Sequence, residues 1–197
     1  MSFATGRTRH RRIGGKNRIF LSSSSGLSFR ATTTHSMPRA ENDPLLNTPA
    51  PAFCLPGTDL PKVCLDQFRG TWVVLYFYPR DNTPGCTLEA MQFNAALEKF
   101  ADLGSQVIGV SGDSVESHKE FAAKHSLKIL LLSDEEHEVL KAYDSWKPLS
   151  LAGKEFFGTQ RDTFLINPAG TVVAVWRKVS PKGHADEVKA VLLGMKG

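Results

Sequence analysis

Cys86 is the residue of this sequence best placed to do chemistry. It follows the uncharged run Trp72 to Tyr78 and a short loop rich in proline and glycine, and a segment with helical spacing follows it. A thiol in the first turn of a helix lies among unpaired backbone N–H groups at the positive end of the helix dipole, and both stabilise the thiolate. Cysteines in such positions have pKa values lowered from about 8.5 to between roughly 3.5 and 7.5.

The residues around Cys86 decide between two interpretations of this thiol. An unpaired cysteine is most often a small buried apolar residue. Here the neighbours Thr83, Pro84, Gly85 and Thr87 are types found in loops and helix caps rather than in cores, which favours a nucleophile. Arg80 is close enough in sequence to add positive charge, and the sequence leaves its direction open.

The elements that must position Cys86 follow from the spacing of apolar residues. Short apolar runs predict strands, amphipathic segments between them predict helices, and the turn sequence 167–170 predicts an antiparallel hairpin between the last two strands. This order predicts an α/β domain with a central mixed sheet, and Cys86 follows the carboxyl end of a central strand, where open α/β sheets place reactive groups. The strands are expected at 72–78, 106–110, 129–132, 163–167 and 172–176, and the helices at 87–102, from 112–114 to about 125, at 136–142 and at 182–193.

The charge of the chain is divided unevenly along its length. Of 24 basic and 20 acidic residues, the first 40 positions hold eight basic and no acidic ones, so residues 41–197 hold 16 basic and 20 acidic residues. A mildly acidic folded part argues against nucleic-acid binding, and no run of residues is apolar enough for a membrane helix. We expect a targeting segment at 1–40, a linker at 41–51 and one domain at 52–197.

The first 40 residues have the composition of an organellar transit peptide. They are rich in arginine, serine and threonine and free of acidic residues, with the runs 22–25 and 32–34 as their clearest low-complexity stretches. We expect import into an organelle, with a mitochondrion favoured over a plastid because arginine occurs within the first ten residues and exceeds lysine. A disordered arm or a nuclear address at 7–18 are the alternatives, with the protein then nuclear or cytoplasmic.

The other cysteines do not indicate a metal or a cofactor. Three cysteines without a Cys-x-x-Cys pair, and without histidine at ligand spacing, give no zinc site and no dithiol motif. Cys54 and Cys64 alternate with apolar residues, and we expect each to be a buried, inert thiol.

The segment from Pro79 through Thr83-Pro-Gly-Cys86-Thr87, after an aromatic strand, is similar to the peroxiredoxin signature. The Pro-Gly-Cys-Thr sequence at 84–87 resembles that of the subfamily of bacterioferritin comigratory protein and peroxiredoxin Q. The resemblance covers residues 50–197, whose motifs follow one another in the order typical of the family. The resemblance implies a thioredoxin-like fold and a thiol-dependent peroxidase that reduces hydrogen peroxide and organic hydroperoxides, with antioxidant defence and redox homeostasis as its role.

The resemblance also implies the roles of four residues. Cys86 is the peroxidatic cysteine that becomes a sulfenic acid, Thr83 hydrogen-bonds the peroxide, Pro79 shields the pocket, and Arg161 lies beside the thiolate. These types suit the reaction, because a hydroxyl donates and accepts, while a forked guanidinium can hold both sulfur and oxygen. Without the resemblance, Thr83 would be interpreted as a helix cap and Arg161 as an exposed residue at a strand start. Glu89 is interpreted as a capping or dipole partner.

The sequence departs from the resembled subfamily at Met91. Many members carry a second, resolving cysteine at this position, five residues after the first. We therefore expect a one-cysteine cycle in which thioredoxin, glutaredoxin or glutathione reduces the sulfenic acid. Cys64 and, less well, Cys54 are the remaining candidates for a resolving thiol.

A thioredoxin-fold chaperone or binding module with incidental peroxide reactivity is the alternative function. A disulfide reductase is weaker, because Cys86 has no Cys-x-x-Cys partner. The short end of the chain after the last predicted helix offers no arm for exchange between subunits, so we expect a monomer.

Overall fold

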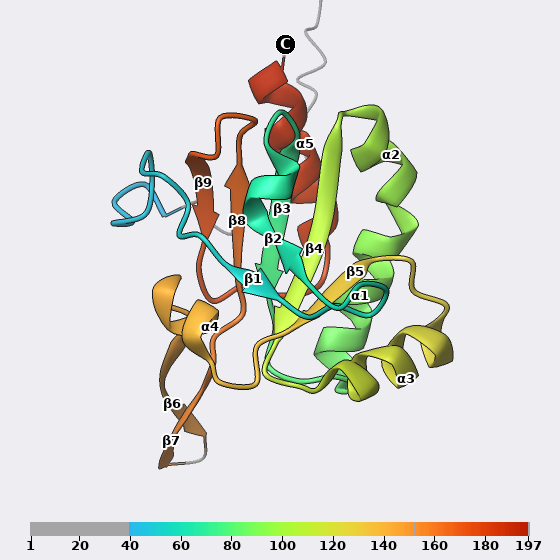
Figure 1. Ribbon diagram of the computed structural model, residues 1–197. Coiled ribbons are helices and arrows are strands. Elements are labelled where there is room, and N and C mark those ends of the chain that lie inside the picture. Colours follow the sequence, from blue (N-terminus) through green and yellow to red (C-terminus); the bar gives the residue numbers. More distant parts are fainter. Residues whose placement is uncertain (1–39, 152, 197) are drawn as a thin grey trace, which may run out of the picture. The chain divides into compact units, whose positions relative to one another are not determined.

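The computed structural model describes residues 40–151 and 153–196 (Figure 1). The expected targeting segment, apart from Ala40, lies outside these residues. No helix in this part of the chain is long and apolar enough to cross a membrane. The elements in chain order are β1 (Cys54–Leu55), β2 (Val63–Cys64), the 3-10 helix η1 (Leu65–Phe68), β3 (Trp72–Phe77), α1 (Pro84–Ala95), α2 (Leu97–Asp102), β4 (Ser105–Ser111), α3 (Val115–His125), β5 (Leu130–Ser133), α4 (Glu138–Ala142), β6 (Trp146–Leu151), β7 (Lys154–Thr159), β8 (Asp162–Ile166), β9 (Val172–Trp176) and α5 (His184–Lys196).

A mixed five-stranded sheet forms the centre of the described domain, in the order β5-β4-β3-β8-β9. β3 pairs in parallel with β4, and β4 with β5, whereas β8 runs antiparallel to both β3 and β9. The predicted central strand and the predicted final hairpin are therefore confirmed. The pairing of Phe77 with Asp162 brings the start of β8 beside the end of β3, where the loop to α1 begins.

Alternate residues of β3 face two separate cores, because successive side chains of a strand point to opposite faces. Val74, Tyr76 and Tyr78 pack with buried residues of α1, α2, α3 and α5. Val73, Leu75 and Phe77 pack on the other face with the β1–β2 ribbon, α4 and the segment that precedes β1. Figure 1 shows the two layers, with β1, β2 and α4 in front of the sheet and α1 and α5 behind it.

The segment 41–51, expected to be a linker, packs against the domain. Leu45 and Leu46 lie against the second core, and the Asn47 N–H donates to the Val172 carbonyl at 2.8 Å. Asp43 forms an ion pair with Arg177 at 2.8 Å. The prolines and asparagines of this segment predict a linker, but in the structure the segment forms turns and lies along the edge strand β9.

Two features of the secondary structure differ from the sequence prediction. The helix expected at 87–102 starts at Pro84 and is divided at Ala96, whose φ of −98° and ψ of 0° end α1 and begin α2. The antiparallel hairpin of β6 and β7 was not predicted. Pro148 and Gly158 lie within it, and both residue types weaken a strand signal.

Candidate active site

Cys86 is the third residue of α1, and its side chain is buried, at 2% exposure. Thr83 is the N-cap residue with extended backbone, and Pro84 is the first helical residue, where a missing N–H costs nothing. The Sγ atom therefore lies in the helical turn whose N–H groups have no partner within the helix. This is the environment that the sequence predicts for a thiolate.

Arg161 supplies the positive charge beside Cys86. Its Nη2 donates to Cys86 Sγ at 3.2 Å, and its side chain is 12% exposed. The residue directly precedes β8, so the antiparallel pairing with β3 carries it to the start of α1. The interpretation of Arg161 as an exposed residue at a strand start is excluded by this burial.

Glu89 completes a buried group of three side chains that the sequence analysis did not assemble. Its carboxylate accepts a hydrogen bond from Arg161 Nη1, and its Oε1 has no hydrogen-bond partner among the described residues. Burial raises the pKa of Glu89 to about 7, and the charge and hydrogen bond of Arg161 offset only part of that effect. The sequence predicts a capping or dipole partner here, whereas the carboxylate accepts its hydrogen bond from Arg161. The spacing of Glu89, three residues from Cys86 on one helix, was the available signal.

Thr83, Pro79 and Arg80 lie in the loop before α1 and are less buried. Thr83 is half-buried, its hydroxyl donates to the Arg80 carbonyl at 3.1 Å, and its oxygen accepts no capping hydrogen bond from the helix. Pro79 is exposed at the end of β3. The Arg80 side chain is 79% exposed and faces Asp113, at 4.0 Å, so it does not add to the charge around Cys86.

A buried polar network fixes this loop to α3 and β5. The Asp81 carboxylate accepts hydrogen bonds from Tyr78 at 2.7 Å and from Ser117 at 2.8 Å, and it lies 2.8 Å from His118 Nδ1. The other ring nitrogen of His118 donates to the Leu132 carbonyl at 3.1 Å. Burial raises the pKa of Asp81, but these hydrogen bonds and the histidine outweigh it, so the net pKa is lowered. The loop is therefore held by a charged carboxylate.

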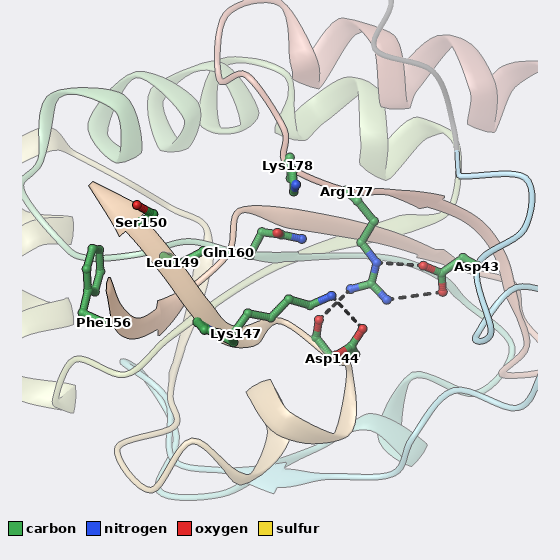
Figure 2. A pocket seen from close by; sticks show the side chains of 10 residues that line it. Asp43, Asp144, Lys147, Leu149, Ser150, Phe156, Gln160, Arg177 and Lys178 are labelled. Atoms are coloured by element: carbon green, nitrogen blue, oxygen red, sulfur yellow. Dashed lines mark hydrogen bonds and ion pairs between the residues drawn. The ribbon is translucent and has the colours of Figure 1, made fainter. Parts of the chain in front are cut away.

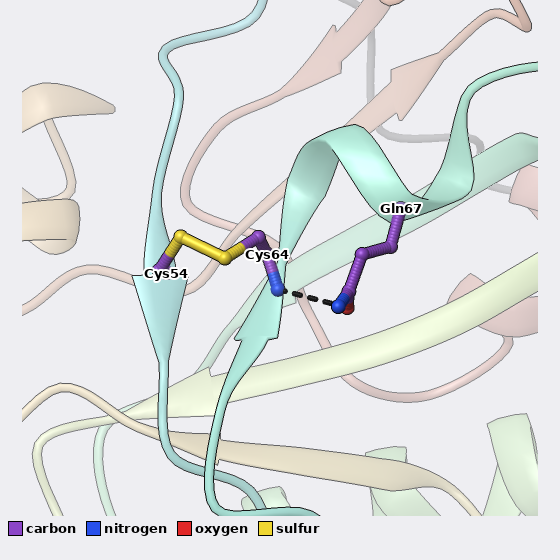
Figure 3. Close-up of a disulfide and its surroundings, with 3 residues drawn as sticks. All are labelled: Cys54, Cys64 and Gln67. Atoms are coloured by element: carbon purple, nitrogen blue, oxygen red, sulfur yellow. Dashed lines mark hydrogen bonds between the residues drawn. A yellow bond between two sulfur atoms is a disulfide. The ribbon is translucent and has the colours of Figure 1, made fainter.

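Cys54 and Cys64 form a disulfide across the β1–β2 ribbon, with Cα atoms 4.0 Å apart (Figure 3). The expectation of two buried, inert thiols is wrong. Leu55 of β1, Phe53 directly before it and Val63 of β2 face the core, so alternation turns the two cysteines outward. Cys54 is exposed and Cys64 is half-buried.

A pocket of about 710 Å³ opens between the β6–β7 hairpin and the ends of β8 and β9 (Figure 2). It does not include Cys86, Glu89 or Arg161. Two of its cations are held by carboxylates: Arg177 by Asp43 and Lys147 by Asp144 at 2.7 Å. Its lining residues are Asp43, Asp144, Lys147, Pro148, Leu149, Ser150, Phe156, Gln160, Arg177 and Lys178.

Comparison with known proteins places the chain among relatives of one kind. Residues 46–175 match the AhpC/TSA family. Peroxiredoxin Bcp of Bacillus subtilis is 46% identical over 146 residues, which cover 74% of this chain and 93% of the relative. The chloroplastic peroxiredoxin Q of Sedum lineare is 40% identical over 153 residues, covering 76% and 78%.

A solved structure supports the same relationship. This chain superposes on the bacterioferritin comigratory protein of Xanthomonas campestris with a TM-score of 0.70. That structure concerns the alkyl peroxide reduction activity of the Xanthomonas protein. The two sequences are 41% identical, and the match covers 74% of this chain and 92% of that one. The thioredoxin-like fold expected from the sequence is thereby confirmed.

Proposed function

This chain belongs to the AhpC/TSA family and is a peroxiredoxin of the Bcp and Q type, which is a thiol peroxidase. We propose that Cys86 is its peroxidatic cysteine. The Cys86 thiolate attacks one peroxide oxygen, the O–O bond breaks, and the departing oxygen takes a proton. The products are a Cys86 sulfenic acid and water or an alcohol. The observation that carries this proposal is the 3.2 Å contact of Arg161 Nη2 with Cys86 Sγ.

Arg161 acts in this reaction by stabilising negative charge. It holds the thiolate before attack, and its fork of donors also reaches an oxygen on which charge develops as the O–O bond breaks. Glu89 fixes the other end of the guanidinium through Nη1. Glu89 is therefore a positioning residue, which acts through Arg161.

Thr83 and Pro79 border the approach to the thiol. Thr83 is the N-cap of the helix that carries Cys86, and rotation of its hydroxyl away from the Arg80 carbonyl would let it bind a peroxide oxygen. Pro79 shields this approach from water. No cofactor or metal takes part in the proposed reaction.

The electrons that return the oxidised cysteine to the thiol come from an external reductant. Met91 stands where a resolving cysteine is found in many relatives of this kind, and Cys54 and Cys64 are bonded to each other. The reductant is a thiol such as thioredoxin, glutaredoxin or glutathione, and the substrates are hydrogen peroxide and organic hydroperoxides.

Stopped-flow measurement of peroxide consumption by Cys86→Ser tests this proposal. We expect the first equivalent of peroxide to be consumed by the wild-type chain and by Cys64→Ser, but not by Cys86→Ser. Unchanged consumption by Cys86→Ser would exclude the proposal. If that variant retained the ability to keep a heat-denatured client protein soluble, the alternative of a chaperone would gain support.

The chain is proposed to act in an organelle. The plant relatives that it matches are named chloroplastic, including those of Sedum lineare and Populus jackii, so the preference for a mitochondrion over a plastid gains no support. Fusion of residues 1–40 to a fluorescent protein, followed by import into isolated plastids and mitochondria, separates the two. We further propose a monomer, which sedimentation velocity would test.

A further inference from the structure

The Cys54–Cys64 disulfide lies at the surface of the domain and not in its core. Each strand of its ribbon is two residues long, and Cys54 is exposed. The apolar side chains of the ribbon already hold it on the domain, with Phe53 at 7%, Leu55 at 8% and Val63 at 1% exposure. The bond is therefore accessible to an external thiol.

The ribbon also keeps the two sulfurs opposite each other. Cys54 and Cys64 are paired in register, and their neighbours Leu55 and Val63 are paired next to them. After reduction, the packing of these neighbours would still present the two thiols face to face. A mixed disulfide formed on one thiol can then be released by the other, which is the property of a dithiol redox couple.

Cys86 cannot be reached by this pair within one molecule. Its side chain belongs to the core between the sheet and helices α1, α2, α3 and α5. The ribbon packs on the opposite face of the same sheet, as Figure 1 shows. Electron transfer between the two sulfur centres must therefore take place between two molecules.

We propose that Cys54 and Cys64 form a second redox centre, which passes electrons from an external dithiol reductant to the oxidised Cys86 of a second copy of this chain. This inference rests on the proposed function, because it requires a Cys86 sulfenic acid. It assigns the immediate reductant of that acid to this chain itself.

The steps balance as follows in atoms and electrons. The thiolate of Cys54, the more exposed of the two, attacks the Cys86 sulfenic sulfur of the second copy, and the hydroxide leaves as water after taking a proton. The Cys64 thiolate then attacks Cys54 Sγ, which forms the Cys54–Cys64 bond and releases Cys86 as a thiolate. The external dithiol reduces this bond by the same exchange and is itself oxidised to a disulfide. The first two steps together move two electrons from the Cys54 and Cys64 thiols to Cys86, and the last step moves two electrons from the external dithiol to the Cys54–Cys64 bond.

Turnover with two reductants tests the inference. With thioredoxin, its reductase and NADPH, we expect the double variant Cys54→Ser/Cys64→Ser to turn over tert-butyl hydroperoxide about tenfold or more slowly than the wild type. Lys62→Gln, in the same ribbon, is the matched control and should behave as the wild type. With dithiothreitol, which is small enough to reduce Cys86 directly, the double variant and the control should be equal.

The first equivalent of peroxide, measured without reductant, separates this inference from the proposed function. If the double variant consumes it normally and also turns over with thioredoxin at the control rate, the second redox centre is wrong while the peroxidase stands. If the wild-type chain does not consume it, the proposed function itself fails.

A trapped intermediate tests the transfer between copies. Cys64→Ser, reduced and then treated with one equivalent of peroxide, should accumulate a dimer joined by Cys86 and Cys54, which peptide mapping by mass spectrometry identifies. The dimer should be absent when Cys86→Ser is added to that variant. A Cys86–Cys54 bond found within a single chain, or a dimer that persists without Cys86, would overturn the transfer between copies.

Discussion

At the scale of single residues, the site depends on one guanidinium that contacts two buried side chains. Arg161 touches Cys86 Sγ through Nη2 and Glu89 through Nη1. Both of these side chains are buried, Cys86 at 2% and Glu89 at 0% exposure. A change at any of the three side chains therefore alters the other two.

Arg161→Lys should slow the oxidation of Cys86 by peroxide about 100-fold, because an ammonium cannot hold the thiolate, the carboxylate and the peroxide oxygen together. Stopped-flow fluorescence at a series of peroxide concentrations gives the second-order rate constant. Arg80→Lys, at the exposed arginine of the preceding loop, is the control and should leave that constant unchanged. An equal rate for Arg161→Lys would show that Arg161 is not required.

Glu89→Gln should change how stability depends on pH. The folded-state pKa of Glu89, about 7, lies above the ordinary 4.5, so the folded protein holds the proton more tightly than the unfolded chain. This contribution is fully present below pH 4.5 and is lost as the pH rises to about 7, by about 3 kcal/mol in total. We expect the free energy of urea unfolding of the wild type, minus that of Glu89→Gln, to fall in this way as the pH rises. The same difference taken with Glu98→Gln, a change at an exposed residue of α2, should not depend on pH.

At the scale of the elements, helix α1 is held against the sheet by stacked rings. Tyr76 of β3 stacks on Phe93 of α1 with ring centroids 4.8 Å apart, and on Tyr78 at 5.6 Å. The Tyr76 ring lies where a side chain of Gly109, in the neighbouring strand β4, would otherwise stand. A Cβ atom at Gly109 would come within 2.6 Å of the Tyr76 hydroxyl oxygen and Cζ.

Gly109→Ala should therefore destabilise the fold by about 1–3 kcal/mol, because the sheet and α1 must move apart to admit the methyl group. Gly194→Ala is the matched control in α5, where the new methyl group meets no atom within 4 Å. That substitution should be neutral or stabilise the fold by up to about 1 kcal/mol. Urea unfolding gives the free energy of unfolding of both variants. Equal values for Gly109→Ala and Gly194→Ala would contradict the packing of Tyr76 against Gly109.

The elements themselves were largely predictable from the sequence, and the site was predictable only in part. The uncharged run that became β3 and the turn that joins β8 to β9 depend on local patterns. Cys86 could be placed for the same reason, since it follows a strand and begins a helix. The contacts of Arg161 with Glu89 and of Cys54 with Cys64 depend on strand pairing and register, which side-chain patterns along the chain do not specify.

The position of the break at Ala96 was also beyond the sequence pattern. The apolar spacing of 87–102 is continuous with one helix, and alanine is a strong helix former. Phe93 and Phe100 are both fully buried in one core, but residues seven apart share a face of an unbroken helix as well. Their packing therefore does not account for the break.

At the scale of the whole described domain, the disulfide should contribute to stability as well as to redox chemistry. It closes a loop with a sequence separation of 10. By lowering the conformational entropy of the unfolded chain, such a bond raises the free energy of unfolding by roughly 2–3 kcal/mol. We expect a reducing agent to lower the free energy of urea unfolding of Cys86→Ser by this amount and to leave Cys54→Ser/Cys64→Ser/Cys86→Ser unaffected. If reduction left the free energy of unfolding of Cys86→Ser unchanged, this assignment would be wrong.

An ion pair joins the segment before β1 to the end of β9. Arg177, just after β9, is held between Asp43 and the fully buried Asp162. Asp162 directly follows Arg161, so the ion pair of the preceding segment lies one residue from the active site. Truncation studies of this protein should therefore begin no later than residue 40.

The two sulfur centres on opposite faces of one sheet give the molecule a usable orientation. A maleimide linker attached at Cys54 in the Cys64→Ser background would fix the chain to an electrode or a glass support by its ribbon face. The start of α1, which carries Cys86, would then face away from the support. An immobilised layer of this protein could be oriented by its own cysteines, with no added tag.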